Sequence, residues 1–422
     1  MRERENMTAK FLRNLGPGIL WAGAAIGVSH LVQSTRAGAE YGFALLWIVV
    51  LANLFKYPFF EYGTRYAAAT GRSLISGYLD MGKFYFILYL ILTIATMFTI
   101  QAAVTIVTAG LVSWLTGDLF SPLVFSILIL LMSIILLYFG KYKALDRFMK
   151  LIIILLSLTT LIAFSAAFGE FGLKVREGAL IPGIWNKKGI LFMIALMGWM
   201  PSAIDISVWS SIWTLEKKKE RGDKLDLRSS LLDFNLGYLG TSLISLLFLS
   251  LGAMVMFGSG EVLSGSGSVF AGQFISLYTK SIGGWSRYII AVAAVTTMFS
   301  TTITCLDAFS RVMRESTARI TGKAGEDKAN EKTYFIWMII VSAGAIILLT
   351  VLKSSMVFMV TVATTLSFLT APVLAVMNFK VVTGRNMPLH AVPPGWLIVL
   401  SWLGIAFLTG FSSVYLYFLF VV

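Results

Sequence analysis

Two short runs interrupt long apolar stretches of this 422-residue chain, and they hold the residues with the greatest capacity for binding chemistry. The first is Gly27-Val28-Ser29-His30 and the second is Met200-Pro201-Ser202. A lipid-spanning helix breaks only where the freed backbone groups meet protein, water or a solute. Serine hydroxyls, the imidazole and the N–H groups that begin each following half-helix are hydrogen-bond donors. Donors without a nearby acidic ligand favour a small anion over a metal cation.

The composition places these runs in a membrane. Hydrophobic residues make up 57% of the chain and charged residues only 13%, whereas about a quarter of the residues in soluble domains are charged. We expect a polytopic membrane protein without a removable signal peptide. The single cysteine, Cys305, excludes an intramolecular disulfide and is expected to be a small core residue. No nucleotide-binding loop and no hydrolytic triad is found, so we expect neither an enzyme nor a cofactor.

Apolar runs of about 20 residues predict eleven membrane-spanning helices. Their approximate ranges are 16–40, 43–68, 84–115, 121–140, 143–168, 188–213, 230–257, 284–312, 333–353, 355–378 and 396–420. Residues 271–282 are too short and too polar for another span, and they predict an interfacial helix.

The basic residues predict the orientation of these spans. Most of the 34 Lys and Arg fall in segments that are internal if residues 1–15 lie in the cytoplasm, as the positive-inside rule requires. The net charge of +13 is then explained by contact with anionic lipid headgroups, without a nucleic-acid partner. We expect an integral protein of a bacterial inner membrane.

The two interrupted spans occupy matching places in the two halves of the chain. Helices 1–5 (residues 16–168) and helices 6–10 (residues 188–378) are predicted to form inverted repeats, with residues 396–420 as helix 11. Broken helices at corresponding positions of such repeats indicate the substrate site of a secondary transporter. Gly27 and Pro201 lie mid-span in helices 1 and 6, and Pro201 cannot donate the usual intrahelical hydrogen bond.

Several short motifs resemble those of one transporter family. They are Gly16-Pro17-Gly18, the segment 38–47, Asn53-Leu54, Gly71-Arg72 and Met200-Pro201. Together with the eleven-helix plan, they resemble the NRAMP family of proton-coupled divalent-metal transporters. The resemblance implies an all-α LeuT-type fold of five plus five helices and one C-terminal helix.

The positions that carry the chemistry of that family differ here. The family's Asp-Pro-Gly-Asn motif corresponds to Gly27-Val28-Ser29-His30, so its metal-binding carboxylate is absent. Ser202 and Ser207 stand where the family has two histidines, and Thr364 stands for a glutamine of helix 10. Residues 84–117 contain no Asp or Glu, although helix 3 of the family carries acidic residues linked to proton movement.

These observations leave three hypotheses. The first is a secondary transporter of a small anion such as bicarbonate, with Gly27, Ser29, His30, Met200, Pro201, Ser202 and Thr364 as substrate-binding residues and no bound metal. The second is a divalent-cation (Mn, Fe or Mg) transporter with a rebuilt site, and the third is a nontransporting sensor or scaffold. Either proton or sodium is compatible as a coupling ion.

Other ionisable residues and His30 have simpler interpretations. The alternative for His30 is a packing residue whose ring is hydrogen-bonded to a backbone carbonyl. Asp205 either restores a carboxylate to the site or pairs with Arg36 or Lys56. Lys56, Glu61, Asp233 and Asp307 lie outside the broken segments, so we expect them to form structural pairs or to snorkel.

Overall fold

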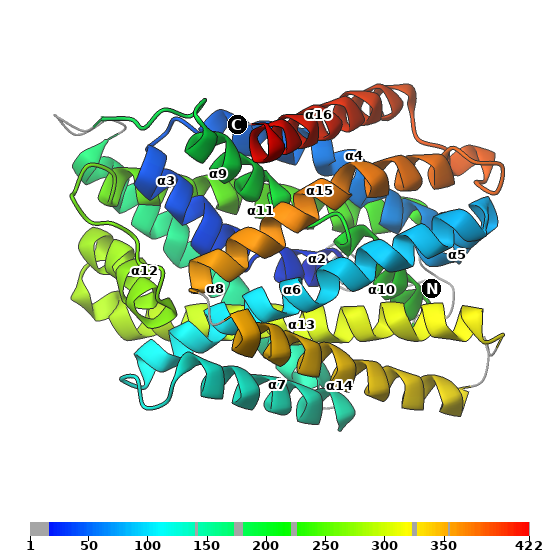
Figure 1. Cartoon of the computed structure of the whole chain (residues 1–422), viewed down its shortest axis with the longest axis horizontal. Helices are drawn as coiled ribbons and strands as arrows, with labels where there is room; N and C mark the ends of the chain where they lie inside the picture. Colours follow the sequence, from blue (N-terminus) through cyan, green and yellow to red (C-terminus); the bar gives the residue numbers. More distant parts are fainter. Residues whose placement is uncertain are drawn as a thin grey trace, which may run out of the picture.

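A computed structural model describes residues 17–139, 142–172, 180–220, 226–322, 327–352 and 355–421. Within these ranges the chain is helical and contains no strand. The long helices run roughly along one axis (Figure 1). In this view α16 lies along one edge of the bundle, whereas α7 and α14 lie along the opposite edge. The predicted cytoplasmic segment, residues 1–15, lies outside the described residues.

The helices of the first half follow the predicted ranges closely. They are α2 (Pro17–Ala25), the π-helix η1 (Ser29–Ser34), α3 (Thr35–Tyr41), α4 (Leu46–Thr70), α5 (Leu74–Met81), α6 (Lys83–Leu115), α7 (Pro122–Tyr138) and α8 (Tyr142–Phe171). The short α5 was not predicted from the sequence.

The second half repeats the pattern of one broken helix followed by long ones. Its helices are α9 (Lys187–Gly198), α10 (Ile206–Glu220), α11 (Leu227–Val255), α12 (Gly267–Ile282), the 3-10 turn η2 (Gly284–Ser286), α13 (Arg287–Ile320), α14 (Asp327–Leu352), α15 (Met356–Val382), the 3-10 turn η3 (Leu389–Ala391) and α16 (Gly395–Phe420). The short helix expected at residues 271–282 begins four residues earlier, at Gly267.

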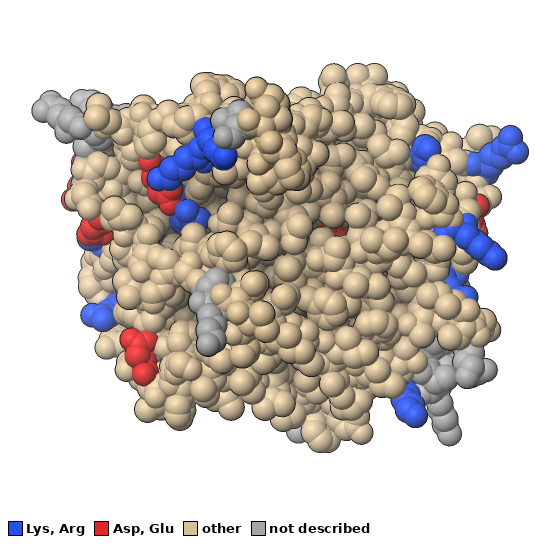
Figure 2. Space-filling view, viewed as in Figure 1, with Lys and Arg blue, Asp and Glu red and all other residues tan. Residues whose placement is uncertain are grey.

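Seven helices in the described part of the chain are long and apolar enough to cross a membrane. They lie in α6, α8, α11, η2–α13, α14, α15 and α16. Each of the other predicted spans coincides with a shorter, interrupted or more polar helix, such as α4, which carries Lys56, Glu61 and Arg65. Eleven crossings therefore remain a prediction. In Figure 2 charged side chains lie mainly toward the two ends of the helices, and the broad surface between them is nearly uncharged.

The first interruption lies between α2 and η1. The helix ends at Ala25, and the chain turns at Ile26 and Gly27 before the π-helix begins. A Cβ atom on Gly27 would lie 2.7 Å from Thr301 Oγ1 of α13, so a glycine allows this close approach. The Thr301 hydroxyl donates to the freed carbonyl of Ile26 at 3.3 Å. The break is thus held against α13.

The second interruption lies between α9 and α10. α9 ends at Gly198, the Met200–Pro201 peptide bond is cis, and α10 begins at Ile206. A Cβ atom on Gly198 would lie 1.9 Å from the carbonyl oxygen of Thr364, which places α9 directly against the backbone of α15. The two halves of this helix are therefore positioned by α15 and by α4, on which α10 packs.

Candidate substrate-binding site

A small cavity lies where the two interrupted helices meet α6 and α13. Its volume is about 30 Å³, which is enough for one or two molecules of the size of water. Ser29, Ser202 and Thr301 contribute hydroxyl groups, and Cys305 contributes its thiol. The other lining residues are apolar or aromatic, and none is acidic. The structure thus brings together two of the predicted site residues, Ser29 and Ser202.

The side chains of Ser29 and His30 bond chiefly to their own surroundings. The Ser29 hydroxyl lies 2.8 Å from the Ala25 carbonyl oxygen and 2.7 Å from His30 Nδ1, and its one proton is shared between these two acceptors. His30 is fully buried, and its Nε2 lies 3.0 Å from the carbonyl oxygen of Thr241 in α11. Because a carbonyl only accepts, Nε2 is the donor, and Nδ1 of a neutral ring is then an acceptor. In this conformation His30 holds the break against α11 and does not line the cavity.

Met200 and Thr364 join the second break and α15 to the π-helix. The Ser34 hydroxyl donates to the Met200 sulfur at 3.7 Å, and Gln33 Nε2 donates to the Thr364 hydroxyl at 3.2 Å. All four side chains are fully buried. Met200 and Thr364 therefore contact the first broken helix, as expected for one site, but they do not line the small cavity. The sequence analysis missed Gln33, which connects the π-helix to Thr364 of α15.

Lys56 is the most consequential residue that the sequence analysis misinterpreted. Its side chain is fully buried, and its ammonium donates to the carbonyls of Met197, Gly198 and Ser202 at 3.0, 3.0 and 2.6 Å. The expectation that Lys56 would form a structural pair or snorkel is wrong, because the side chain crosses from α4 to the last turn of α9 and the break that follows it. By contrast, Glu61 pairs with Arg65 at 2.6 Å and Asp307 with Arg311 at 2.7 Å, which confirms structural pairing.

Asp205 lies in the second break without the expected close partner. Arg36 pairs with Glu40 at 2.9 Å, and among the described residues no ion pair within 4.0 Å joins Asp205 to Lys56. The two charges still interact through space. The Asp205 side chain is buried, and its Oδ2 has no hydrogen-bond partner in the described structure. The expected close pairing of Asp205 with Arg36 or Lys56 is therefore wrong, and Asp205 interacts with Lys56 only at longer range.

A metal site requires several donors that converge on one point. Among the described residues, no group of three or more His, Cys, Asp and Glu side chains lies close enough together to hold a metal ion. The groups near the breaks are hydroxyls, one imidazole, one thiol, one thioether, backbone carbonyls, one ammonium and the single carboxylate of Asp205. One carboxylate beside an ammonium is less anionic charge than a divalent cation needs in a low-dielectric interior.

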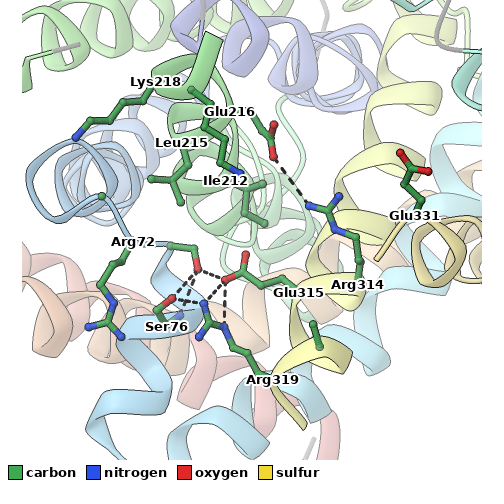
Figure 3. A pocket seen from close by; sticks show the side chains of 14 residues that line it. Arg72, Ser76, Ile212, Leu215, Glu216, Lys218, Arg314, Glu315, Arg319 and Glu331 are labelled. Atoms are coloured by element: carbon green, nitrogen blue, oxygen red, sulfur yellow. Dashed lines mark hydrogen bonds and ion pairs between the residues drawn. The ribbon is translucent and has the colours of Figure 1, made fainter. Parts of the chain in front are cut away.

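A larger cavity of about 760 Å³ opens at one end of the bundle, where α5, α10 and α13 meet (Figure 3). Arg319 donates to the Ser76 hydroxyl at 2.5 Å and pairs with Glu315 at 2.8 Å, while Ser73 donates to Glu315. These contacts join α5 to α13 across the cavity. In the loop before α5, hydrogen bonds to Asp80 raise the pKa of Arg72, which keeps its guanidinium charged. The cavity is a candidate vestibule at this end of the bundle.

Comparison with known proteins decides the family. The sequence model of the natural resistance-associated macrophage protein-like (Nramp) family matches residues 18–418, which is nearly the whole chain. The chain belongs to the Nramp family. This match confirms the resemblance expected from the sequence. Nramp proteins are transporters and not enzymes.

The individual relatives differ in how much of the chain they match. An uncharacterized protein of Pasteurella multocida is 36% identical over 417 residues, which cover 98% of this chain and 94% of that protein. A divalent metal cation transporter, MntH, of Listeria monocytogenes is 24% identical over 266 residues, or 60% of this chain and 58% of the transporter.

Solved structures confirm the fold. The manganese transporter of Eremococcus coleocola has a TM-score of 0.68 at 17% identity and covers 98% of this chain and 88% of its own. MhsT in complex with L-phenylalanine has a TM-score of 0.66 at 14% identity, with coverage of 96% and 98%. The chain is therefore an integral membrane Nramp transporter with the all-helical LeuT fold.

Proposed function

We propose that this Nramp protein is a secondary transporter that carries a small monoanion, specifically bicarbonate, by alternating access between the two interrupted helices. The observation that carries the proposal is the chemistry of the cavity between the breaks. Ser29, Ser202 and Thr301 supply hydroxyls there, and no acidic side chain lines it. Bicarbonate is planar and combines acceptor oxygens with one hydroxyl. The Ser202 hydroxyl would donate to it, while the oxygens of Ser29 and Thr301, whose protons go to acceptors such as the carbonyls of Ala25 and Ile26, would accept from its hydroxyl.

The helix ends near the cavity support an anionic substrate. η1 begins at Ser29 and α10 begins at Ile206, so the first N–H groups of both half-helices lie beside the breaks. In this conformation the first N–H groups already donate to carbonyls of the breaks, as from Leu31 to Gly27 at 2.9 Å and from Ser207 to Ile204 at 2.9 Å. The helix starts therefore contribute partial positive charge to the site, and direct donation to a substrate would require these bonds to open. Gly27, Pro201, Met200 and Thr364 form the surrounding frame of the proposed site. His30 belongs to the site through the contact of its Nδ1 with the Ser29 hydroxyl.

A divalent metal cation is the second candidate substrate. It is favoured by Asp205, whose buried Oδ2 lacks a partner, and by the Met200 thioether in the same broken segment. The name of the Listeria relative, a divalent metal cation transporter, points the same way. Against it stands the absence of further anionic ligands around Asp205 in the described residues. A nontransporting sensor or scaffold is the remaining alternative, to be adopted if neither ion is carried.

The orientation and coupling complete the proposal. We place the N-terminus in the cytoplasm of a bacterium and the chain in its inner membrane, because the basic residues follow the positive-inside rule. Residues 16–168 and 188–378 form the two inverted repeats of this proposal, and residues 396–420 form the additional helix. The coupling ion is proton or sodium, which imposed gradients of each ion would separate.

Proteoliposomes that enclose a pH-sensitive dye test this function. Entry of bicarbonate alone or with sodium makes the interior alkaline, whereas CO2 that crosses the lipid makes it acidic. Bicarbonate carried with one proton has the same net effect as CO2, so an alkaline change identifies bicarbonate entry without a proton. We expect alkalinisation with the wild-type protein and a rise in KM of about tenfold with Ser202→Ala, because one hydrogen bond to an anion is lost.

The matched control is Ser413→Ala, which removes an exposed hydroxyl of α16 that bonds only to its own helix at Thr409. This control should behave like the wild type. Wild-type vesicles that accumulate labelled manganese but show no bicarbonate-dependent alkalinisation would overturn the proposal.

A further inference from the structure

The Lys56 ammonium has a coordination shell made of backbone oxygens. A lysine ammonium has three N–H donors, and here each meets one carbonyl, from Met197, Gly198 and Ser202, at 2.6–3.0 Å. Two of these carbonyls belong to the last turn of α9, which is the negative end of that helix. The Phe60 ring centroid adds a weak contact 5.6 Å from the nitrogen.

Converging carbonyl oxygens at the end of a broken helix are also the groups that bind monovalent metal cations. In this chain the three oxygens surround a covalently attached cation. The site is buried, so without Lys56 these oxygens would lose their partner and would have to bind another cation or water.

We propose that the carbonyls of Met197, Gly198 and Ser202 form a monovalent-cation site that the Lys56 ammonium fills permanently. This attached cation also sets the charge selectivity of the neighbouring cavity, a second statement that rests on the proposed anion transport. Lys56 is thus a residue that determines specificity by its charge, without direct contact with the substrate.

Ser202 connects the two sites. Its carbonyl accepts from Lys56 at 2.6 Å, and the same residue lines the cavity between the breaks. The ammonium has no ion-pair partner within 4.0 Å among the described residues, because the nearby Asp205 interacts with it only at longer range and Glu61 pairs with Arg65. The Asp205 carboxylate offsets part of this positive charge. In our proposal the remaining field at the cavity, which has no acidic lining, favours an anion over a divalent cation.

The experiment refills the site from solution. Lys56→Ala removes three methylene groups and the ammonium, a volume that n-propylammonium matches. We expect n-propylammonium chloride to raise the apparent Tm of Lys56→Ala in detergent by more than 2 °C, as ligand binding to the folded state requires. The wild type should not respond, and choline, which has no N–H donor, should have no effect on the variant.

Two further variants complete the test. Lys380→Ala removes an exposed lysine of α15 that contacts only Tyr85, and it should show no response to the amine. Lys56→Met keeps most of the side-chain volume, and it should respond weakly because the space is filled. If Lys56→Ala folds only when n-propylammonium is present during purification, the cation site is supported. Equal yield and equal Tm of Lys56→Ala with n-propylammonium, ammonium, sodium, potassium or choline would overturn it.

A flux measurement then tests the selectivity. In proteoliposomes we expect the bicarbonate flux of Lys56→Ala to be at least tenfold lower than that of the wild type. With n-propylammonium on both sides of the membrane, most of the flux should return. If the wild type carries no bicarbonate, the proposed function fails, but the Tm response still decides whether the cation site exists. If the Tm response is present and the bicarbonate flux of Lys56→Ala equals that of the wild type, the cation site stands and its role in selectivity is wrong.

Discussion

Both interruptions release backbone polar groups from a helix, but these groups find different hydrogen-bond partners at the two breaks. At the first break the freed polar groups find partners nearby or on packed helices, as in the bonds from Ser29 to Ala25 and from His30 to Thr241. At the second break three carbonyls depend on one ammonium that reaches them from α4. The first break is therefore held by neutral hydrogen bonds and the second by a buried charge. This difference teaches that a broken helix can take its positive charge from a neighbouring helix, here beside the one acidic residue, Asp205, of its own broken segment.

The largest expected effect comes from removing that charge without replacing it. Lys56→Met leaves three buried carbonyls without their donor, and we expect a loss of about 3–5 kcal/mol in the free energy of unfolding. Thermal unfolding in detergent would show this as a fall of several degrees in apparent Tm, while Lys380→Met should stay close to the wild type. A stability equal to that of the wild type would mean that water replaces the ammonium at no cost, and the contrast between the breaks would disappear.

The next effect tests the first break through its imidazole. His30→Ala should cost about 2–4 kcal/mol, because it leaves a cavity and removes the donor to Thr241. His30→Gln retains an N–H donor and should restore part of both stability and bicarbonate flux. The only other histidine, the exposed His390, supplies the matched control His390→Gln. Abolished flux at unchanged Tm in His30→Gln would return His30 to the role of direct substrate ligand that the sequence predicts.

The smallest effect concerns the backbone of the first break. Gly27→Ala places a methyl group 2.7 Å from Thr301 Oγ1, and we expect a cost of about 1–3 kcal/mol. Thr301→Ala removes the two nearest atoms, so the double variant should be destabilised by less than the sum of the single changes. Gly410→Ala in α16 meets no atom within 4 Å and is the control. Strict additivity in this cycle would show that the close approach of α2 and α13 does not limit the break.

Much of the fold could be predicted because apolar length and helix-breaking residues are local signals. The predicted ranges coincide with helices, and Gly27 and Pro201 mark the two interruptions. The motifs that resemble those of Nramp proteins then indicated the family, which the match over residues 18–418 confirmed.

The contacts within the site could not be predicted in the same way. Lys56 and His30 bond to backbone carbonyls of distant helices, and a carbonyl has no identity in the sequence. For the same reason Asp205 seemed to need a close cationic partner, whereas the ammonium of Lys56 already donates to carbonyls at the end of α9 and in the break. A search for lone lysines opposite helix interruptions could have identified Lys56 as a candidate.

The sign of the carried charge tests the central claim most directly. Labelled bicarbonate and labelled manganese should be offered to the same batch of wild-type proteoliposomes, with empty liposomes as the reference. The account predicts bicarbonate uptake at least tenfold above the reference, together with internal alkalinisation, and manganese uptake equal to the reference. Manganese uptake above the reference, without a bicarbonate signal, would contradict it.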